Sequence, residues 1–387
     1  MWAIGVGEKP GVNQPGRVRS VDGLRALAFM LVFLFHSWEF SGRPRIPVLT
    51  DIISQNTRPD LFVVITGFAL FLPFAIDQTR YDRFKVGVYL ERRAKRIVLP
   101  YYAALALALV LPYLLKVLYN LTGRTASPTE PVAWGDLLSH LTFTHMFFPE
   151  YWAGINGSLW TMSLEMQLYL LFPILVLAMA RWGVWVLLGA AAISIGWHLL
   201  GPLFVSNTFP ENFLWGATGI GRLVEFGAGM LAAVIVMRHR DKLTRVPLLI
   251  AALLVVLGYA VAVSVRFSGA LEWFPVREIG LSISFCALIV LAIGAAPVEA
   301  VFATPLVSRV GYMAYSFFLV HQPIVYYFSE LLKRGLGMSD GLVLLAILWT
   351  VGLALVFVVG YVLYVLVEEP CIRWSKAAGR RAARSTS

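Results

Sequence analysis

The sequence predicts an all-α integral membrane protein, a bundle of about ten transmembrane helices with both ends of the chain in the cytoplasm. Hydrophobic residues make up 59% of the 387 residues and charged residues only 14%, about half the share of a typical soluble domain. The charged residues gather between long apolar stretches, and they are too few to cover a soluble surface. This composition excludes a soluble globular enzyme.

Ten apolar stretches approach the roughly 20 residues that a spanning helix needs. The second is short, and Pro73 near its end makes it the weakest candidate. The stretches are 22–40, 61–76, 97–118, 158–180, 183–204, 217–237, 246–265, 278–295, 310–332 and 342–367.

The basic residues support this count and orient it, because cytoplasmic loops near helix ends are rich in Lys and Arg. With the N-terminus inside, the even-numbered connections are cytoplasmic, and they carry the basic clusters within 80–96 and 238–245. The tail after the tenth stretch is basic as well. The odd-numbered connections carry less basic charge, with these exceptions: Arg43, Arg45, Arg58, Lys333 and Arg334.

The remaining features of composition narrow the function further. The net charge of +10 accompanies membrane spans, so we expect no nucleic-acid partner. Cys286 and Cys371 are too few for a disulfide framework or a CxxC site, and we expect no metal. The sequence predicts a cytoplasmic N-terminal segment (1–20) without a cleaved signal peptide, one membrane domain (21–370) and a basic cytoplasmic tail (371–387).

The longest external loop, 119–157, contains a moderately apolar piece over 137–148 that is too short to span. Aromatic residues are typical of membrane–water interfaces. The loop therefore predicts an interfacial or re-entrant segment. Its aromatic residues are Trp134, Phe143, Phe147, Phe148, Tyr151 and Trp152.

The first apolar stretch carries three ionisable residues, which cost about 2.5–3.5 kcal/mol each inside a membrane and therefore suggest function. Asp22, Arg25 and His36 fall on one helix face, since eleven residues at about 100° each return His36 to the azimuth of Arg25. His36 lies about 16 Å beyond Arg25, past the midplane toward the outside. This face joins the cytoplasmic mouth to a buried imidazole.

Two other stretches carry ionisable residues at a similar depth. Glu165 lies about 10 Å from the outer end of its stretch, close to the depth of His36. His321 lies at mid-depth, although a packing histidine before Pro323 explains it equally well. A buried carboxylate and imidazole suit acid–base catalysis, and equally a proton relay in a transporter. These residues alone leave both functions open.

A basic cluster precedes the third stretch. Four cations, Arg92, Arg93, Lys95 and Arg96, occupy about two helical turns. This composition suits a receptor for phosphate or another anion. A cytoplasmic anchor that follows the positive-inside rule is the favoured interpretation from composition alone.

Short motifs follow one another along almost the whole chain in a specific order. They are Asp22-Gly-Leu-Arg25 with His36, Leu61 to Phe68, Arg92-Arg93 with Arg96-Ile97 and Pro100-Tyr101, Ser158-Leu-Trp160 with Ser163-Leu-Glu165 and Tyr169, Tyr315 to His321 with Pro323, and Glu369-Pro370. In this order the chain resembles the acyltransferase-3 family, ten-span membrane O-acyltransferases. Thr66 where Ser is commoner and Ala26 where Gly is frequent are two departures, and both residues are small.

The resemblance implies transfer of an acyl group, usually acetyl from acetyl-CoA, to a hydroxyl of a carbohydrate or related acceptor. Such an acceptor is a cell-surface glycan or a glycosylated metabolite, and the enzyme lies in the plasma or inner membrane. Acyl-CoA is the donor substrate, and we expect no bound cofactor. The alternative is a proton-coupled exporter of a sugar or antibiotic, but the sequence shows neither inverted repeats nor paired broken helices.

The resemblance also implies roles for individual residues. His36 is the catalytic histidine, as a general base or a transient acyl carrier, with Arg25 as its paired arginine. Asp22 braces the start of the helix, and Glu165 orients the imidazole or balances its charge. Arg92, Arg93 and Arg96 face the CoA phosphates. Ser158, Trp160, Tyr169 and His321 are assigned to substrate binding.

Overall fold

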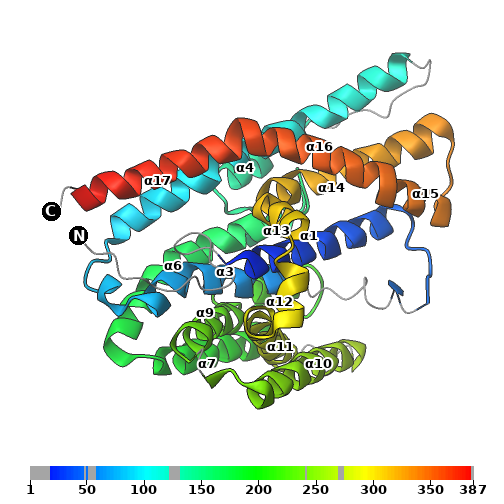
Figure 1. The fold of residues 1–387 in the computed structure, drawn as a ribbon. Coiled ribbons are helices and arrows are strands. Elements are labelled where there is room, and N and C mark those ends of the chain that lie inside the picture. The colour runs from blue at the N-terminus through cyan, green and yellow to red at the C-terminus, as the bar shows by residue number, and fades with distance from the viewer. Residues whose placement is uncertain are drawn as a thin grey trace.

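The computed structural model describes residues 18–47, 49–50, 58–121, 131–239, 242–268 and 274–384. All regular structure in these residues is helical, which confirms the predicted all-α membrane fold (Figure 1). Residues 1–17 of the predicted N-terminal segment, 122–130 of the long loop and 385–387 of the predicted tail lie outside the described residues.

The helices follow the apolar stretches closely. The α-helices are α1 (Arg19–Phe40), α3 (Arg58–Ile76), α4 (Val86–Leu121), α5 (Trp134–Leu141), α6 (Trp160–Trp182), α7 (Trp185–Leu200), α8 (Glu211–Gly216), α9 (Leu223–Arg238), α10 (Arg245–Ser268), α11 (Phe274–Gly294), α12 (Ala296–Phe302), α13 (Pro305–Tyr312), α14 (Ala314–Glu330), α15 (Leu342–Ile347), α16 (Leu353–Leu363) and α17 (Glu369–Arg384). Short 3₁₀ helices are η1 (Gln78–Arg80), η2 (His145–Phe147) and η3 (Gly201–Leu203), and π-helices are η6 (Leu331–Gly335), η7 (Leu348–Gly352) and η8 (Tyr364–Glu368).

Eight helical segments of the described chain are long and apolar enough to cross a membrane. The other two predicted spans correspond to α9 and α14, which have 16 and 17 residues. At about 1.5 Å per residue these helices measure about 24 and 26 Å, less than the roughly 30 Å of bilayer hydrocarbon. The ten-span count and the cytoplasmic side of both termini therefore stay predictions.

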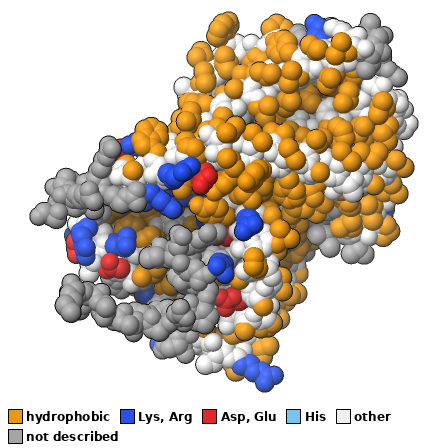
Figure 2. Space-filling view, turned by 45° about the horizontal axis from the view of Figure 1, so that its top comes forward, with side chains coloured by type: hydrophobic (Ala, Val, Ile, Leu, Met, Phe, Trp, Pro, Cys, Tyr) orange, Lys and Arg blue, Asp and Glu red, His pale blue; other side chains and the backbone are white. Residues whose placement is uncertain are grey.

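The outer surface of the bundle is apolar. Figure 2 shows hydrophobic side chains over most of one face, while Lys, Arg, Asp and Glu gather toward one end. Helix α10 alone exposes Val246, Leu249, Leu253 and Val256, among others. Exposed apolar area of this extent is unfavourable in water and matches lipid.

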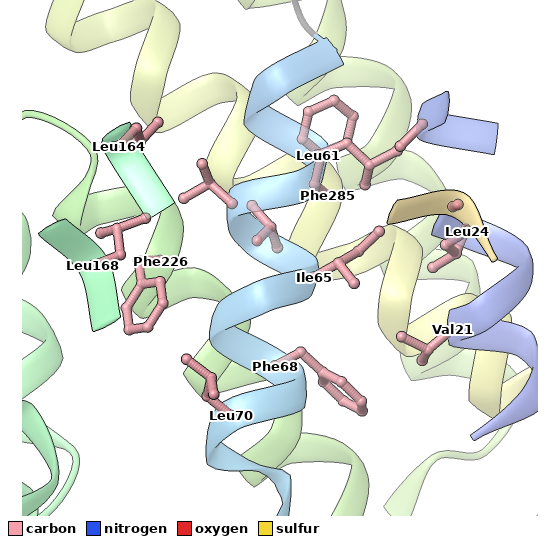
Figure 3. Close-up of a cluster of buried hydrophobic side chains, with 14 of the residues drawn as sticks. Val21, Leu24, Leu61, Ile65, Phe68, Leu70, Leu164, Leu168, Phe226 and Phe285 are labelled. Atoms are coloured by element: carbon pink, nitrogen blue, oxygen red, sulfur yellow. The ribbon is translucent and has the colours of Figure 1, made fainter. Parts of the chain in front are cut away.

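Helix α3 runs through the middle of the core (Figure 3). Its Leu61, Ile65 and Phe68 are almost fully buried. Leu24 of α1 lies on one side of α3, and Leu168 of α6 lies on the other. Because α3 contacts α1, α6, α9 and α11, its position determines how these helices face one another.

The segment that contains α5 and η2 is amphipathic with its polar side inward. Trp134 is 79% exposed, and Leu138 and Phe147 are exposed as well, whereas His140 is fully buried. The Tyr101 hydroxyl of α4 donates a hydrogen bond to the His140 carbonyl oxygen at 2.9 Å. An exposed apolar face on a short helix fits the interfacial segment that the sequence predicts for this loop.

Glycines allow helix backbones to touch at two crossings. A Cβ on Gly67 of α3 would overlap the Phe226 carbonyl oxygen, and a Cβ on Gly229 of α9 would overlap that of Val64. A Cβ on Gly23 of α1 would likewise overlap the Phe302 carbonyl oxygen. Close backbone approach through small residues is a principal source of helix association in membranes. Gly23 and Gly67 of the sequence motifs therefore have packing roles.

We predict that Gly229→Ala lowers the free energy of unfolding by about 1–3 kcal/mol, because the new methyl group enters a filled helix crossing. Thermal unfolding in detergent measures the effect. Gly196→Ala in α7 is the matched control, since a Cβ there meets nothing within 4 Å and alanine favours the helix. Equal unfolding midpoints for the two variants would contradict the close packing of α3 and α9.

Candidate active site

His36 of α1 and His321 of α14 lie side by side. Their ring centroids are 5.3 Å apart, and His321 is fully buried. His321 Nδ1 lies 2.5 Å from the Phe318 carbonyl oxygen, and a carbonyl only accepts, so Nδ1 carries the proton. His321 Nε2 is then a proton acceptor without a hydrogen-bond partner in the described part of the chain. The pair therefore combines two imidazoles at one buried point.

The carboxylate that contacts His36 belongs to Glu39. His36 Nδ1 lies 3.3 Å from Glu39 Oε2, and Arg43 donates to the other oxygen of Glu39 at 2.7 Å. Phe40 stacks on the His36 ring at 5.9 Å. The spacing of three residues places Glu39 on the same helix face as His36, and this signal was available in the sequence. The sequence motifs had directed attention to Glu165 instead.

Glu165 of α6 makes its hydrogen bonds elsewhere in the bundle. Its two oxygens accept from the Tyr169 hydroxyl at 3.0 Å and from the Thr66 hydroxyl at 3.3 Å. Arg96 and Arg25 lie in electrostatic range of Glu165. In the described chain Glu165 therefore interacts with Tyr169, with Thr66 of α3 and with the arginines. No hydrogen bond between Glu165 and His36 is found among the described residues, so its predicted role at the imidazole stays a prediction.

Asp22 and Arg25 form an ion pair at the start of α1. Arg25 Nη1 donates to Asp22 Oδ1 at 2.6 Å, and Asp22 is buried while the Arg25 side chain is 29% exposed. The Asp22 carbonyl oxygen packs directly against Gly311 of α13. Asp22 therefore orients the Arg25 guanidinium, which lies in electrostatic range of Glu165 of α6.

The three arginines at the start of α4 face different surroundings. The Arg93 guanidinium lies 5.7 Å from the ring centroid of Tyr89 and 5.8 Å from that of Tyr169, which suits cation–π attraction. Arg96 is partly buried and lies in electrostatic range of Glu165. Arg92 is exposed, and its carbonyl oxygen accepts from the Ser375 hydroxyl of α17 at 2.9 Å. The cluster thus extends from the surface toward Glu165.

The loop before α6 is tied to α14 close to His321. Asn156 Oδ1 accepts from the backbone N–H of Ser158 at 3.1 Å and from its hydroxyl at 2.8 Å. Asn156 Nδ2 donates to the Leu319 carbonyl oxygen at 3.3 Å. Trp160 packs on Phe213 with ring centroids 4.9 Å apart. Ser158 and Trp160, assigned above to substrate binding, make turn and packing contacts here.

Glu368 is a buried carboxylate that the motifs did not identify. The Ser316 hydroxyl of α14 donates to Glu368 Oε2 at 2.5 Å, and Arg96 and Arg25 lie in electrostatic range. The side chain of its neighbour Glu369, which the closing motif includes, is 40% exposed. Glu368 ends the π-helix η8, and this local geometry rather than the amino-acid pattern directs it inward.

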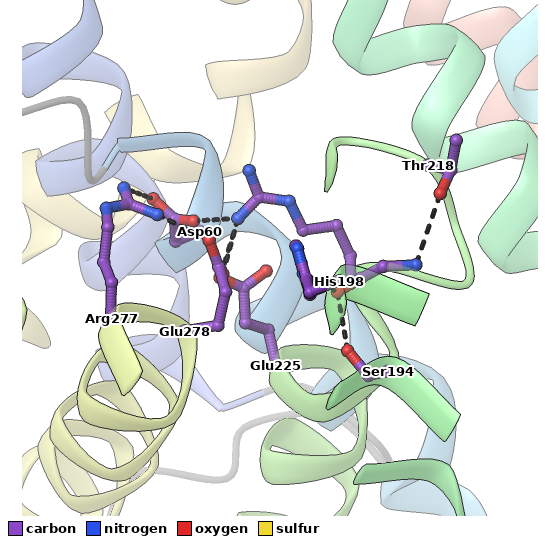
Figure 4. A network of polar contacts seen from close by, with 9 residues as sticks. Asp60, Ser194, His198, Thr218, Glu225, Arg277 and Glu278 are labelled. Carbon is purple, nitrogen blue, oxygen red and sulfur yellow. Dashed lines mark hydrogen bonds and ion pairs between the residues drawn. The ribbon is translucent and has the colours of Figure 1, made fainter. Parts of the chain in front are cut away.

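A second set of charges is buried where α3, α9 and α11 begin (Figure 4). Arg222 Nη1 contacts Asp60, Glu225 at 2.9 Å and Glu278 at 2.6 Å. Arg277 donates to Glu278 at 2.6 Å and to Asp60 at 3.2 Å. Sequence reasoning missed this group, although Arg222, Glu225 and Glu278 lie inside predicted spans, where charges are rare.

The three carboxylates of this group have the composition of a metal site, with ligand oxygens within 4.8 Å of one another. Arg222 Nη1, however, contacts all three of them and occupies the position that a cation would take. The group is therefore an ion-pair cluster. The turn that carries Arg222 is held by Ser194 Oγ, which donates to the Gly221 carbonyl oxygen at 2.6 Å.

Comparison with known proteins identifies the class to which this multi-pass membrane protein belongs. The chain is a member of the family described as "Acyltransferase domain", whose model matches residues 18–365. It is similar to Acyltransferase MdmB of Streptomyces mycarofaciens, with 27% identity over 398 residues, 96% of this chain and 95% of that protein. No solved structure matches the chain.

A further similarity concerns part of the chain. Peptidoglycan O-acetyltransferase OatA of Listeria monocytogenes serovar 1/2a (strain ATCC BAA-679 / EGD-e) is 22% identical over 214 residues, which cover 51% of this chain and 31% of that protein. Family and relatives together establish a membrane-embedded acyltransferase and confirm the resemblance seen in the motifs.

We predict that Arg222→Met destabilises the protein by about 3–5 kcal/mol, because it leaves three buried carboxylates without their shared guanidinium. Chemical or thermal unfolding in detergent measures the loss. Arg181→Met removes an exposed arginine and should change stability by no more than about 0.5 kcal/mol. Wild-type stability of Arg222→Met would show that the cluster does not hold the three helices.

Proposed function

We propose that this acyltransferase moves an acyl group, in the simplest case acetyl, from acyl-CoA to a hydroxyl of a carbohydrate-type acceptor at the plasma membrane. The observation that carries the proposal is the His36–His321 pair, with rings 5.3 Å apart and a buried His321 Nε2 that has no hydrogen-bond partner among the described residues. A hydroxyl within hydrogen-bond reach of an imidazole nitrogen at this point meets a base, as general-base catalysis requires.

In the proposed chemical step His36, beside His321, acts as the general base. His36 removes the proton of the acceptor hydroxyl, and the oxygen attacks the thioester carbonyl carbon. The carbon–sulfur bond then breaks, the new ester leaves on the acceptor, and the thiolate of CoA takes up the proton. Glu39 beside His36 stabilises the imidazolium that forms in between.

The donor approaches from the basic end of α4 in this proposal. Arg92 at the surface and Arg96 farther in bind the CoA phosphates. Arg25, which like Arg96 lies in electrostatic range of Glu165, extends this row of arginines. About 16 Å of helix α1 separates Arg25 from His36, a distance that the pantetheine arm has to cover. Glu165 and Glu368 balance the arginines, so the path carries both signs of charge.

The acceptor class rests on the relatives. One of them is named a peptidoglycan O-acetyltransferase, so its acceptor is a glycan-containing polymer. Extended similarity to MdmB favours an enzyme over the proton-coupled exporter that intramembrane charges alone would allow. We therefore place a hydroxylated carbohydrate or related compound at the His36–His321 pair.

We predict that His36→Ala lowers acyl transfer by about 10²–10⁴-fold at equal membrane abundance, because the general base is lost. Transfer of radiolabelled acetyl from acetyl-CoA to cell-surface glycans measures the effect. His239→Ala, which changes an exposed histidine outside this site, is the control and should keep full activity. Retained activity in His36→Ala would refute the assignment.

We predict that Arg92→Gln raises the KM for acetyl-CoA by about tenfold, which corresponds to about 1.4 kcal/mol of lost binding, while kcat changes little. Phosphate contacts at the surface act equally in the ground state and the transition state, so they provide uniform binding. Initial rates at varied acetyl-CoA measure both constants. A drop confined to kcat would place Arg92 outside the donor site.

A further inference from the structure

The C-terminal helix α17 lies along the part of α4 that carries the basic cluster. Figure 1 shows the two helices side by side, and the Ser375 hydroxyl donates to the Arg92 carbonyl oxygen at 2.9 Å. At Gly379 an added Cβ would lie 3.2 Å from the Arg92 guanidinium. A ligand held by Arg92 therefore also meets α17. From the sequence alone, residues 371–387 are predicted to form a separate basic tail.

Helix α17 buries most of its apolar side chains against the rest of the protein. Cys371, Ile372 and Ala378 are buried, whereas Arg373 and Lys376 are exposed. An amphipathic helix that lies in the membrane interface instead turns its apolar face toward lipid. Helix α17 is therefore bound to the protein and presents a polar face outward.

One aromatic side chain departs from this pattern. Trp374 is 54% exposed, and the Lys95 ammonium lies 4.8 Å from its ring centroid. Three further cations lie near Trp374 in the sequence or on the adjoining stretch of α4: Arg373, Lys376 and Arg92. Glu91 pairs with Lys95 and Glu369 with Arg373, so a net positive charge remains on the described side chains.

A flat aromatic surface among cations is the chemistry that binds a nucleotide. Aromatic side chains stack on bases, and arginine and lysine hold the phosphates. We propose that α17 forms the second wall of the donor site, with Trp374 stacked on the adenine of CoA and the cations of α17 and α4 on its phosphates. This inference rests on acyl-CoA being the donor, as proposed above.

Equilibrium binding to the purified full-length protein in detergent tests the proposal with two probes. CoA contains the adenine, and 4′-phosphopantetheine lacks it. We expect Trp374→Ala to weaken CoA binding by about 5- to 150-fold and to leave 4′-phosphopantetheine binding unchanged. Trp374→Phe, which keeps an aromatic ring, should bind CoA within a few-fold of the wild type.

Trp182→Ala is the matched control. Trp182 is 61% exposed and also lies beside a cation, with the Arg181 guanidinium 5.7 Å from its ring, but it ends α6 rather than α17. This variant should bind CoA like the wild type. Elution volume and unfolding temperature of each variant exclude a general loss of fold.

The outcomes separate the inference from the proposed function. If the wild type binds neither probe, acyl-CoA is not the donor and the proposed function fails. If the wild type binds CoA and Trp374→Ala binds it equally well, the donor stands and the role of α17 is refuted. If Trp374→Ala loses binding to phosphatidylglycerol vesicles but not to CoA, the patch binds lipid headgroups, and the inference is likewise refuted.

Discussion

Arg222 joins carboxylates from three helices, and the placement of the polar residues in the centre of the bundle depends on it. Asp60 of α3 is one of its partners. The same helix carries Thr66, which donates to Glu165, and Gly67, which allows α9 to approach. Buried ion pairs add little net stability over apolar packing, but a lost partner is costly. The cluster therefore selects one arrangement of α3, α9 and α11 over its competitors.

Two polar centres follow from this arrangement, and α1 connects them. Arg25 lies with Arg96, Glu165 and Glu368, where opposite charges balance. Farther along α1, His36 meets His321 in aromatic surroundings, with the Phe29 ring 6.3 Å from His321. Separate centres suit a reaction whose donor is strongly anionic and whose acceptor is a neutral hydroxyl. In the proposed function, recognition of the charged donor and proton transfer take place at different depths.

Apolar stretch length and helical periodicity predicted the helices and the shared face of Asp22 and Arg25, because both signals lie within a single segment. They overestimated the lengths at 217–237 and 310–332, since Met313 separates α13 from α14 and a turn precedes Leu223. The His36–His321 contact is formed by residues far apart in the chain, so the sequence singled out each histidine as an ionisable residue inside an apolar stretch but did not predict that the two meet. The Arg222 cluster was not predicted, because its members lie on three helices and each helix carries only one or two of the charges.

The π-helix η8 determines which face of the following helix α17 meets α4. A π-turn holds about one residue more than an α-turn, so η8 absorbs one residue without advancing the helix face. If Tyr364–Glu368 formed α-turns instead, everything after this segment would be rotated by about 100°. Ser375 would then turn away from Arg92, although no residue had changed. The backbone hydrogen-bond pattern of this segment therefore fixes the contact between α17 and α4, in addition to the side chains that form it.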